Sequence, residues 1–303
     1  MNHTYVPAFT LEPSKPAVTR PAPGLVRTPR FIDDVAAGRV ELPTIPRVVQ
    51  RLIATLRDPD ADVRTIGQAL SQDPVLSAKV LRVANSAHFG SGRSVTSIDA
   101  AVAMIGTQPL GRLIMACGVA SSFQQVPGID LRIFWRDALV AATAASRLAP
   151  GLAANPDEAY TCGLLHAAGH LILCQSYPEI ATAMFAGFEV VRGAELAAIE
   201  TDAFGIDHPQ VGALWVQSLG FPATIASTIG NATRPLADID APLDLALHSA
   251  CLLVAAVAKS DASEDALATL PTGVRERFTA ANGEPDRAFS KLYETLQATE
   301  PMF

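Results

Sequence analysis

Residues 42–106 read LPTIPRVVQRLIATLRDPDADVRTIGQALSQDPVLSAKVLRVANSAHFGSGRSVTSIDAAVAMIG. Apolar residues recur here at the three- and four-residue spacing of an amphipathic helix, for example Val48, Val49 and Leu52 after Pro46. Asp73 is predicted to cap another helix that has Pro74 at its first position, because proline needs no N–H partner there. The stretch predicts short, consecutive helices, followed by one that Thr107 caps and that ends before Val126.

The second half of the chain shows the same helical spacing and no alternating strand pattern. Its predicted helices span residues 131–149, 157–175, 178–188, 194–204, 208–219, 222–229 and 243–259. We therefore expect an all-α protein in two parts, with a five-helix N-terminal part. The expected divisions are a Pro-rich flexible tail over 1–30, helical parts over 31–126 and 127–260, and a C-terminal helical extension over 261–303 that packs on the body.

Composition narrows the classes of function. Of the 303 residues, 49% are hydrophobic and the formal net charge is −7, so the chain can bury a large core and is not suited to broad binding of nucleic acid. Its start lacks the basic and apolar pattern of a secretory signal, and its longest apolar run is interrupted by Asp244 and His248. We expect a cytoplasmic protein without a membrane span.

Several motifs in a fixed order resemble the HDOD domain, the HD-related output domain of bacterial signalling proteins. In the first part they are SQDP, LRVANSA and TSIDAAVAMIG; in the second they are FWRDALVAATAASRLA (134–149), AYTCGLLHAAGHLIL (159–173) and FGIDHPQVGALWVQSLGFPATIASTI (204–229). The resemblance covers about residues 40–260. It implies a two-part helical bundle whose second part has the skeleton of a metal-dependent HD phosphohydrolase.

The resemblance also indicates where an active HD enzyme would hold its metal ions, with converging imidazoles and carboxylates. At the first of those positions this chain has Asp137 in place of a histidine, and at the His-Asp pair it has His166 followed by Ala167. His208 is retained. Further on, Asn231 stands in place of a histidine and Cys251 in place of the late aspartate. The methyl group of Ala167 replaces the bridging carboxylate. We therefore expect a degenerate site with no metal, no cofactor and no catalytic residue.

Two further groups of residues are candidates for a ligand site or an interface. His166 and His170 are four residues apart and would share one face of an unbroken helix, as in zinc-protease motifs, although no glutamate follows His166. Asn85 and Ser86 end a helix, where Asn85 either recognises a ligand or ties the helix to the next loop. The favoured interpretations are core or interface histidines and a structural asparagine.

The resemblance, together with the broken ligand set, implies a non-enzymatic regulatory module that binds other signalling proteins, such as sensor kinases, response regulators or cyclic-di-GMP enzymes, with a possible role in motility or stress control. Two alternatives stay open. One is a small-ligand or nucleotide sensor that uses a cavity near His166 and His208. The other is a residual metal-dependent phosphohydrolase that uses Asp137, His166, His170 and His208.

Overall fold

The computed structural model describes residues 30–55, 70, 73–85, 95–185, 193–257, 268, 270–282 and 290. Every regular element in these ranges is helical, which confirms the all-α class. The α-helices are α1 (Phe31–Ala36), α2 (Arg47–Thr55), α4 (Pro74–Ala84), α5 (Ile98–Ile105), α6 (Thr107–Ala120), α7 (Leu131–Leu148), α8 (Pro156–Leu165), α9 (Ala168–Ser176), α10 (Pro178–Phe185), α11 (Gly193–Phe204), α12 (His208–Ser218), α13 (Ala223–Gly230), α14 (Pro242–Val257) and α16 (Thr272–Asn282). Short 3₁₀ helices η1 (Ala149–Leu152) and η2 (Leu236–Asp238) lie between them.

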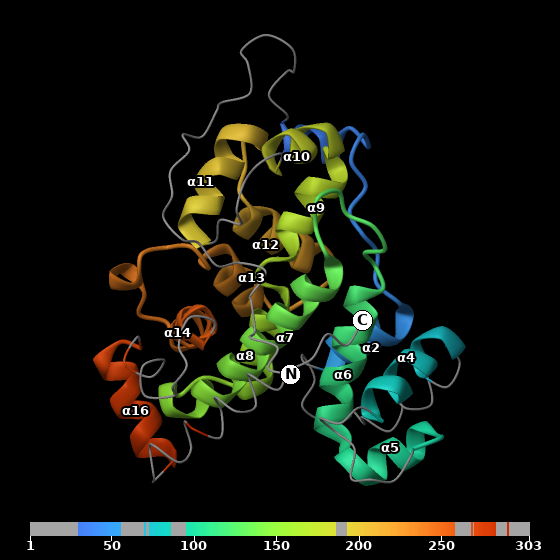
Figure 1. Ribbon diagram of the computed structural model, residues 1–303, viewed down its shortest axis with the longest axis vertical. Coiled ribbons are helices and arrows are strands. Elements are labelled where there is room, and N and C mark those ends of the chain that lie inside the picture. The colour runs from blue at the N-terminus through green and yellow to red at the C-terminus, as the bar shows by residue number, and fades with distance from the viewer. Residues whose placement is uncertain are drawn as a thin grey trace, which may run out of the picture.

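The first group of helices consists of α2, α4 and α5 around α6 (Figure 1). Gly118 of α6 allows close approach, because a Cβ there would come 2.0 Å from Cγ2 of Val49 and 3.8 Å from Cδ2 of Leu76. Asp73 caps α4 as predicted, accepting a 3.0 Å hydrogen bond from the Leu76 amide. The predicted cap at Thr107 is wrong: Gly106 is the N-cap of α6, with φ 87°, and no side chain caps it.

In the second group, α13 and α14 pack against the pair formed by α7 and α8 (Figure 1). Helix α12 joins α13 to α9, and α10 and α11 contact α9 and α12 respectively. Gly163 lets α8 touch the backbone of α7, since a Cβ at this position would lie 2.6 Å from Cα of Ala142. Alanines dominate the buried side of α7, so the two helices pack at short range. Helix α16 lies against η1 and buries Val274.

Helix α1 lies against the second group although it comes first in the chain. Phe31 meets Tyr177 edge to face, and Tyr177 in turn stacks on Phe204 of α11. The Tyr177 hydroxyl donates a 2.8 Å hydrogen bond to Asp34. These contacts cross the boundary predicted at residue 126, so α1 is part of the surroundings of α9 and α11.

The helix predicted over 157–175 is wrong as a single element. It is broken into α8 and α9, with His166 as the C-cap of α8 and Ala167 (φ −104°, ψ 1°) as the N-cap of α9. The break falls between His166 and His170, so the two residues do not belong to one continuous helix. In the part of the chain that the structure describes, no helix is both long and apolar enough to cross a membrane.

Candidate functional site

Asp137 lies at a buried position in α7, where the resemblance places the first metal ligand. Its Oδ1 accepts hydrogen bonds from Nε and Nη2 of Arg136 at 3.1 and 2.9 Å, and both side chains are largely shielded from water. A guanidinium therefore already neutralises this carboxylate. Its positive charge would also repel a metal ion placed at the same oxygen.

His166 and Ala167 occupy the break between α8 and α9. The ring Nδ1 of His166 is 2.8 Å from the carbonyl oxygen of Gly163, so Nδ1 donates to that carbonyl. The side chain of Ala167 offers no ligand atom. This chain therefore retains only the histidine of the His-Asp pair found in an active enzyme, and the imidazole of that histidine is hydrogen-bonded to a carbonyl of its own helix.

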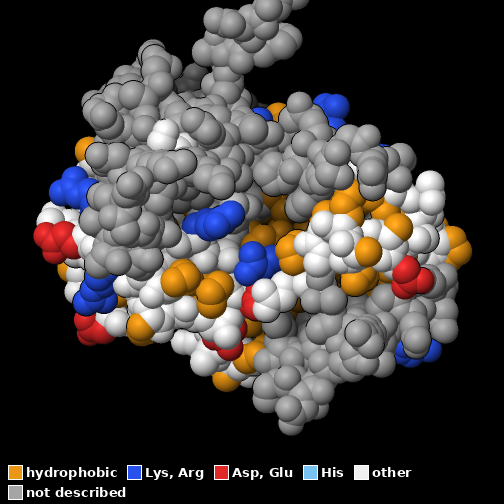
Figure 2. All heavy atoms as spheres, turned by 90° about the horizontal axis from the view of Figure 1, so that it is seen from below, with side chains coloured by type: hydrophobic (Ala, Val, Ile, Leu, Met, Phe, Trp, Pro, Cys, Tyr) orange, Lys and Arg blue, Asp and Glu red, His pale blue; other side chains and the backbone are white. Residues whose placement is uncertain are grey.

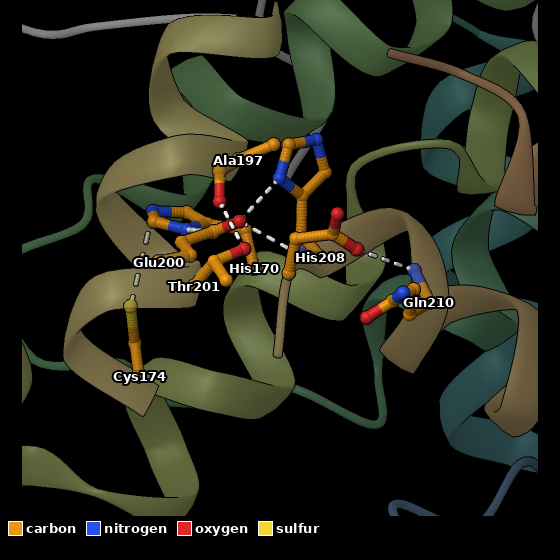
Figure 3. A network of polar contacts seen from close by, with 8 residues as sticks. His170, Cys174, Ala197, Glu200, Thr201, His208 and Gln210 are labelled. Carbon is orange, nitrogen blue, oxygen red and sulfur yellow. Dashed lines mark hydrogen bonds and ion pairs between the residues drawn. The ribbon is translucent and has the colours of Figure 1, made fainter. Parts of the chain in front are cut away.

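His170, Glu200 and His208 come together from α9, α11 and α12 to form a buried cluster, shown in Figure 3. Nδ1 of His170 lies 2.6 Å from Glu200 Oε1, and Nδ1 of His208 lies 2.5 Å from Oε2. The backbone N–H of His208 donates to the same Oε2 at 2.8 Å. The exposed fractions are 0% for Glu200, 5% for His170 and 4% for His208, so the cluster is closed to solvent.

The cluster continues through Cys174, whose Sγ is 3.8 Å from Nε2 of His170 (Figure 3). Burial tends to raise the pKa of Glu200, but hydrogen bonds from His170 and His208 outweigh it and lower that pKa. Burial tends to lower the pKa of His170, whereas Cys174 and Glu200 raise it, and the net pKa is about 10. The cluster therefore holds Glu200 ionised and favours a protonated His170.

His166 and His170 do not lie on one helical face, so they do not form the zinc-protease-like pair that their spacing allowed; the burial of His170 agrees with the favoured interpretation of a core histidine. Because the helix breaks between them, His166 contacts Gly163 while His170 contacts Glu200. His170 instead meets His208, with ring centroids 6.4 Å apart and planes at 80°. The two imidazoles that the structure brings together are thus joined by a carboxylate that already uses both Nδ1 atoms.

Asn231 belongs to a second polar cluster, around Asp244 at the start of α14. Its amide Nδ2 donates to Asp244 Oδ2 at 2.8 Å, and the hydroxyl of Thr228 donates to Oδ1. His248 links the same region to the chain after α13, with Nδ1 2.9 Å from the carbonyl oxygen of Asp244 and Nε2 3.2 Å from that of Arg234. Asp244 is therefore the carboxylate that faces Asn231.

Cys251, where the late aspartate was expected, is half-buried on α14, about two helical turns beyond Asp244. Sequence reasoning missed Asp244 and Glu200 as members of the polar clusters. Asp244 had one available signal, an acidic residue inside a mostly apolar helical run, whereas Glu200 shares its helix with Glu195 and Asp202 and had none. Their partners are distant in the chain and could not be read from spacing.

Asn85 ties the end of α4 to the segment before α5. Its Nδ2 donates to the carbonyl oxygens of Leu81 and Val95, both at 2.8 Å, and its Oδ1 accepts from the Val95 amide at 2.6 Å. These contacts use both functional ends of the amide for structure. Ser86 lies outside the described residues.

The donor set does not fit a metal ion. Asp137 is bound to a guanidinium, His208 to Glu200, and Asn231 to Asp244. Within the described ranges, no three His, Cys, Asp or Glu side chains are grouped so that they could hold one. The two clusters instead hold helices together through buried hydrogen bonds: Glu200 joins α11 to α9 and α12, and Asp244 joins α14 to α13.

Comparisons with known proteins place this fold. A curated but uncharacterised protein of Treponema pallidum (strain Nichols) is 25% identical over 205 residues, which are 67% of this chain and 40% of that protein, so the chain spans well under half of its relative. A crystal structure from Shewanella amazonensis SB2B, provisionally named a phosphohydrolase, is 28% identical with a TM-score of 0.66, covering 90% of this chain and 94% of that one.

A second solved structure, from Marinobacter aquaeolei VT8 and provisionally named a signal transduction protein, is 23% identical with a TM-score of 0.62. The match covers 90% of this chain and 63% of that one, and shows the fold alone. The sequence model of the HDOD domain matches residues 42–235, which is well over half of the 303 residues. The chain therefore belongs to the HDOD domain family.

Proposed function

We propose that this protein is a non-catalytic regulatory module of bacterial signal transduction that acts by binding other signalling proteins. The observation that carries the proposal is the state of the degenerate metal site. Asp137, His166, His208 and Asn231 are engaged with neighbouring groups of the same chain, and Ala167 has no ligand atom. A hydrolase of this fold needs those positions free to converge on a metal-bound water.

The surface supports protein rather than nucleic-acid partners. On the coloured part of the face in Figure 2, basic and acidic side chains are interspersed with hydrophobic ones. Two large apolar side chains are well exposed, Val75 at 69% and Ile32 at 61%. Sensor kinases, response regulators and cyclic-di-GMP enzymes are the classes of partner that we propose, from the family to which the chain belongs.

The alternative of a ligand sensor predicts a polar cavity beside His166 and His208. An open hollow of about 520 Å³ is instead lined by Ser121, Ser122, Gln124, Gln125 and Gln175, after α6 and at the end of α9. His208 is buried against Glu200 and is not among the residues that line this hollow. The described cavity therefore does not favour a sensor that uses the old catalytic centre.

The test combines turnover and binding. The purified protein is assayed against bis-p-nitrophenyl phosphate and cyclic-di-GMP with Mn²⁺, Mg²⁺ and Zn²⁺, beside a variant with Asp137→Ala and His166→Ala. We expect equal background rates from both proteins. Metal-dependent turnover that the double variant loses would overturn the proposal.

Binding is then measured by isothermal titration with purified receiver domains, kinase domains and cyclic-di-GMP enzymes from the same genome. The proposal requires that at least one of these classes forms a saturable complex. Saturable binding of a nucleotide with no protein partner in any class would support the sensor instead.

A further inference from the structure

Charge is divided unevenly between the two parts of the chain. Residues 42–126, which include the first group of helices, contain eight Lys or Arg and five Asp or Glu, a formal net charge of +3. Residues 127–303 contain ten Lys or Arg and 21 Asp or Glu, a formal net charge of −11. The first part of one copy is therefore expected to attract the second part of another copy.

The solvent face of α4 is basic and partly apolar. The opposite face of this helix is buried through Leu76, Val80 and Ala84. The positions that point away from these residues, all exposed or half-buried, are Pro74, Val75, Ala78, Lys79 and Arg82. The face thus combines an apolar side chain that is 69% exposed with two cations, and none of its five side chains is a carboxylate.

Helix α2 contributes two more exposed cations, Arg47 and Arg51. Helices α2 and α4 are neighbours, because both pack against Gly118 of α6. Together with Lys79 and Arg82, the two arginines form a basic surface on the first group. None of these four cations has an ion-pair partner among the described residues, so each is available to a carboxylate of another molecule.

Helix α11 has a solvent face of the opposite charge. The buried face of this helix consists of Leu196, Ala197, Glu200 and Phe204. The opposite face exposes Ala194, Glu195, Ala198, Thr201 and Asp202. This exposed face has two carboxylates and no cation, and its small side chains allow another helix to approach closely.

The two faces match in length as well as in charge. Val75 and Arg82 are seven residues apart on α4, and Glu195 and Asp202 are seven residues apart on α11. At a rise of about 1.5 Å per residue, each pair spans about 10 Å, or two helical turns. In Figure 1, α4 lies at the right in the first group and α11 at the upper left in the second. The faces can therefore meet only between two copies of the chain.

We propose that the solvent face of α4 in one copy docks on the solvent face of α11 in a second copy. Lys79 and Arg82 then face the two carboxylates of α11, and Val75 packs against the alanines between them. A contact of two helices is small for an interface, so the association is reversible. It is independent of the proposed function, because a contact between copies requires no other signalling protein.

The first experiment is analytical ultracentrifugation of the natural protein over a range of concentrations. The weight-average mass should rise above the 31.8 kDa of one chain. We expect a dissociation constant of about 10–100 µM in low salt and association that is about tenfold weaker in 1 M NaCl, because salt screens the charges. A protein that stays monomeric at about 300 µM in low salt, well above that constant, would overturn the proposal.

A charge exchange between the two faces tests which surfaces are in contact. One double variant is Lys79→Glu with Arg82→Glu, and the other is Glu195→Lys with Asp202→Lys. All four side chains lie at the surface, so both variants are expected to fold, as circular dichroism would verify. Each variant alone should associate at least about tenfold more weakly, because like charges then oppose each other.

An equimolar mixture of the two double variants should associate like the natural protein, because each reversed face again meets its opposite charge. Association of either variant alone at the natural strength, or a mixture that stays monomeric, would place the contact elsewhere and contradict the proposal.

The matched control is Arg147→Glu with Arg277→Glu, which changes the net charge by the same amount at exposed positions of the second part. It should leave the association within about twofold of the natural protein. Equal loss in this control would show that net charge alone governs the association. A natural protein that stays monomeric, and whose binding to a partner in the titrations above is lost only in the Lys79→Glu, Arg82→Glu variant, would assign the α4 face to an acidic partner instead.

Discussion

Gly169 of α9 lies directly against the main chain of His208 at the start of α12. A Cβ built on Gly169 would come 2.0 Å from the His208 carbonyl oxygen and 2.7 Å from the Gly212 amide nitrogen. The absence of a side chain at this position is what allows α9 and α12 to approach closely enough for His170 and His208 to share the Glu200 carboxylate.

Replacing Gly169 with alanine is therefore expected to force α9 and α12 apart and to lower the free energy of unfolding by about 3 kcal/mol. Urea denaturation measures the change. The control is Gly273→Ala in α16, where the added methyl group meets no described atom within 4 Å. This control should be neutral or stabilising by up to about 1 kcal/mol. A Gly169→Ala protein with unchanged stability would contradict the close crossing.

The ion pair of Arg112 and Asp157 joins α6 of the first group to α8 of the second. Nε and Nη2 of Arg112 lie 3.0 and 2.8 Å from Asp157 Oδ1, and the guanidinium is 5.1 Å from the centre of the Tyr160 ring. Both charged side chains are about a third exposed, so water screens the pair. A double-mutant cycle with Arg112→Gln and Asp157→Asn should give a coupling free energy of about 0.5–1 kcal/mol.

This coupling should decrease when the salt concentration is raised from 0.1 to 1 M, because exposed charges are screened over a shorter distance. A coupling free energy that does not change with salt would indicate that the packing against Tyr160, rather than the charge pair, connects the two groups.

Thr228 donates one of the two side-chain hydrogen bonds that the buried carboxylate of Asp244 receives. The near-isosteric change Thr228→Val removes this donor, so Oδ1 of Asp244 loses the hydrogen bond from the Thr228 hydroxyl. The free energy of unfolding should therefore fall by about 1–3 kcal/mol. Thr182→Val on the exposed side of α10 is the matched control and should change stability by less than about 0.5 kcal/mol. Equal effects of the two changes would argue against a structural role for the Asp244 cluster.

The four cysteines should differ in reactivity. Cys117, Cys162 and Cys174 are fully buried and Cys251 is half-buried. Burial raises the pKa of Cys117 to about 12 and also raises that of Cys162, so neither forms a thiolate readily. Labelling with Ellman's reagent at pH 8 should show one fast thiol, which Cys251→Ser abolishes, and three that react only on unfolding. Two or more fast thiols in the native protein would be inconsistent with this core.

Much of the first half could be predicted because its helix ends are encoded locally. Asp73 and Ser97 accept hydrogen bonds from amides three residues later, as expected of residues that cap helices. Pro46 precedes α2 and Pro74 opens α4. Such signals act over one turn, so a single sequence displays them.

The break between α8 and α9 was not predicted, because HAAGH carries no proline and its alanines favour a continuous helix. Tertiary packing outweighs this local preference: Gly169 must meet the backbone of His208, which lies 39 residues further along the chain. For this reason His166 and His170, although four residues apart, do not share one helical face.

By itself, the sequence determined the all-α class and most helix boundaries, because these depend on residue type and short-range spacing. The replacement of HD metal ligands at Asp137, Ala167 and Asn231 is what the family resemblance implies. Only the tertiary structure decided that Glu200 joins His170 to His208 and that Asp244 meets Asn231. A buried polar group must find its partner among whatever helices pack around it, and that neighbourhood is set by long-range contacts rather than by local order along the chain.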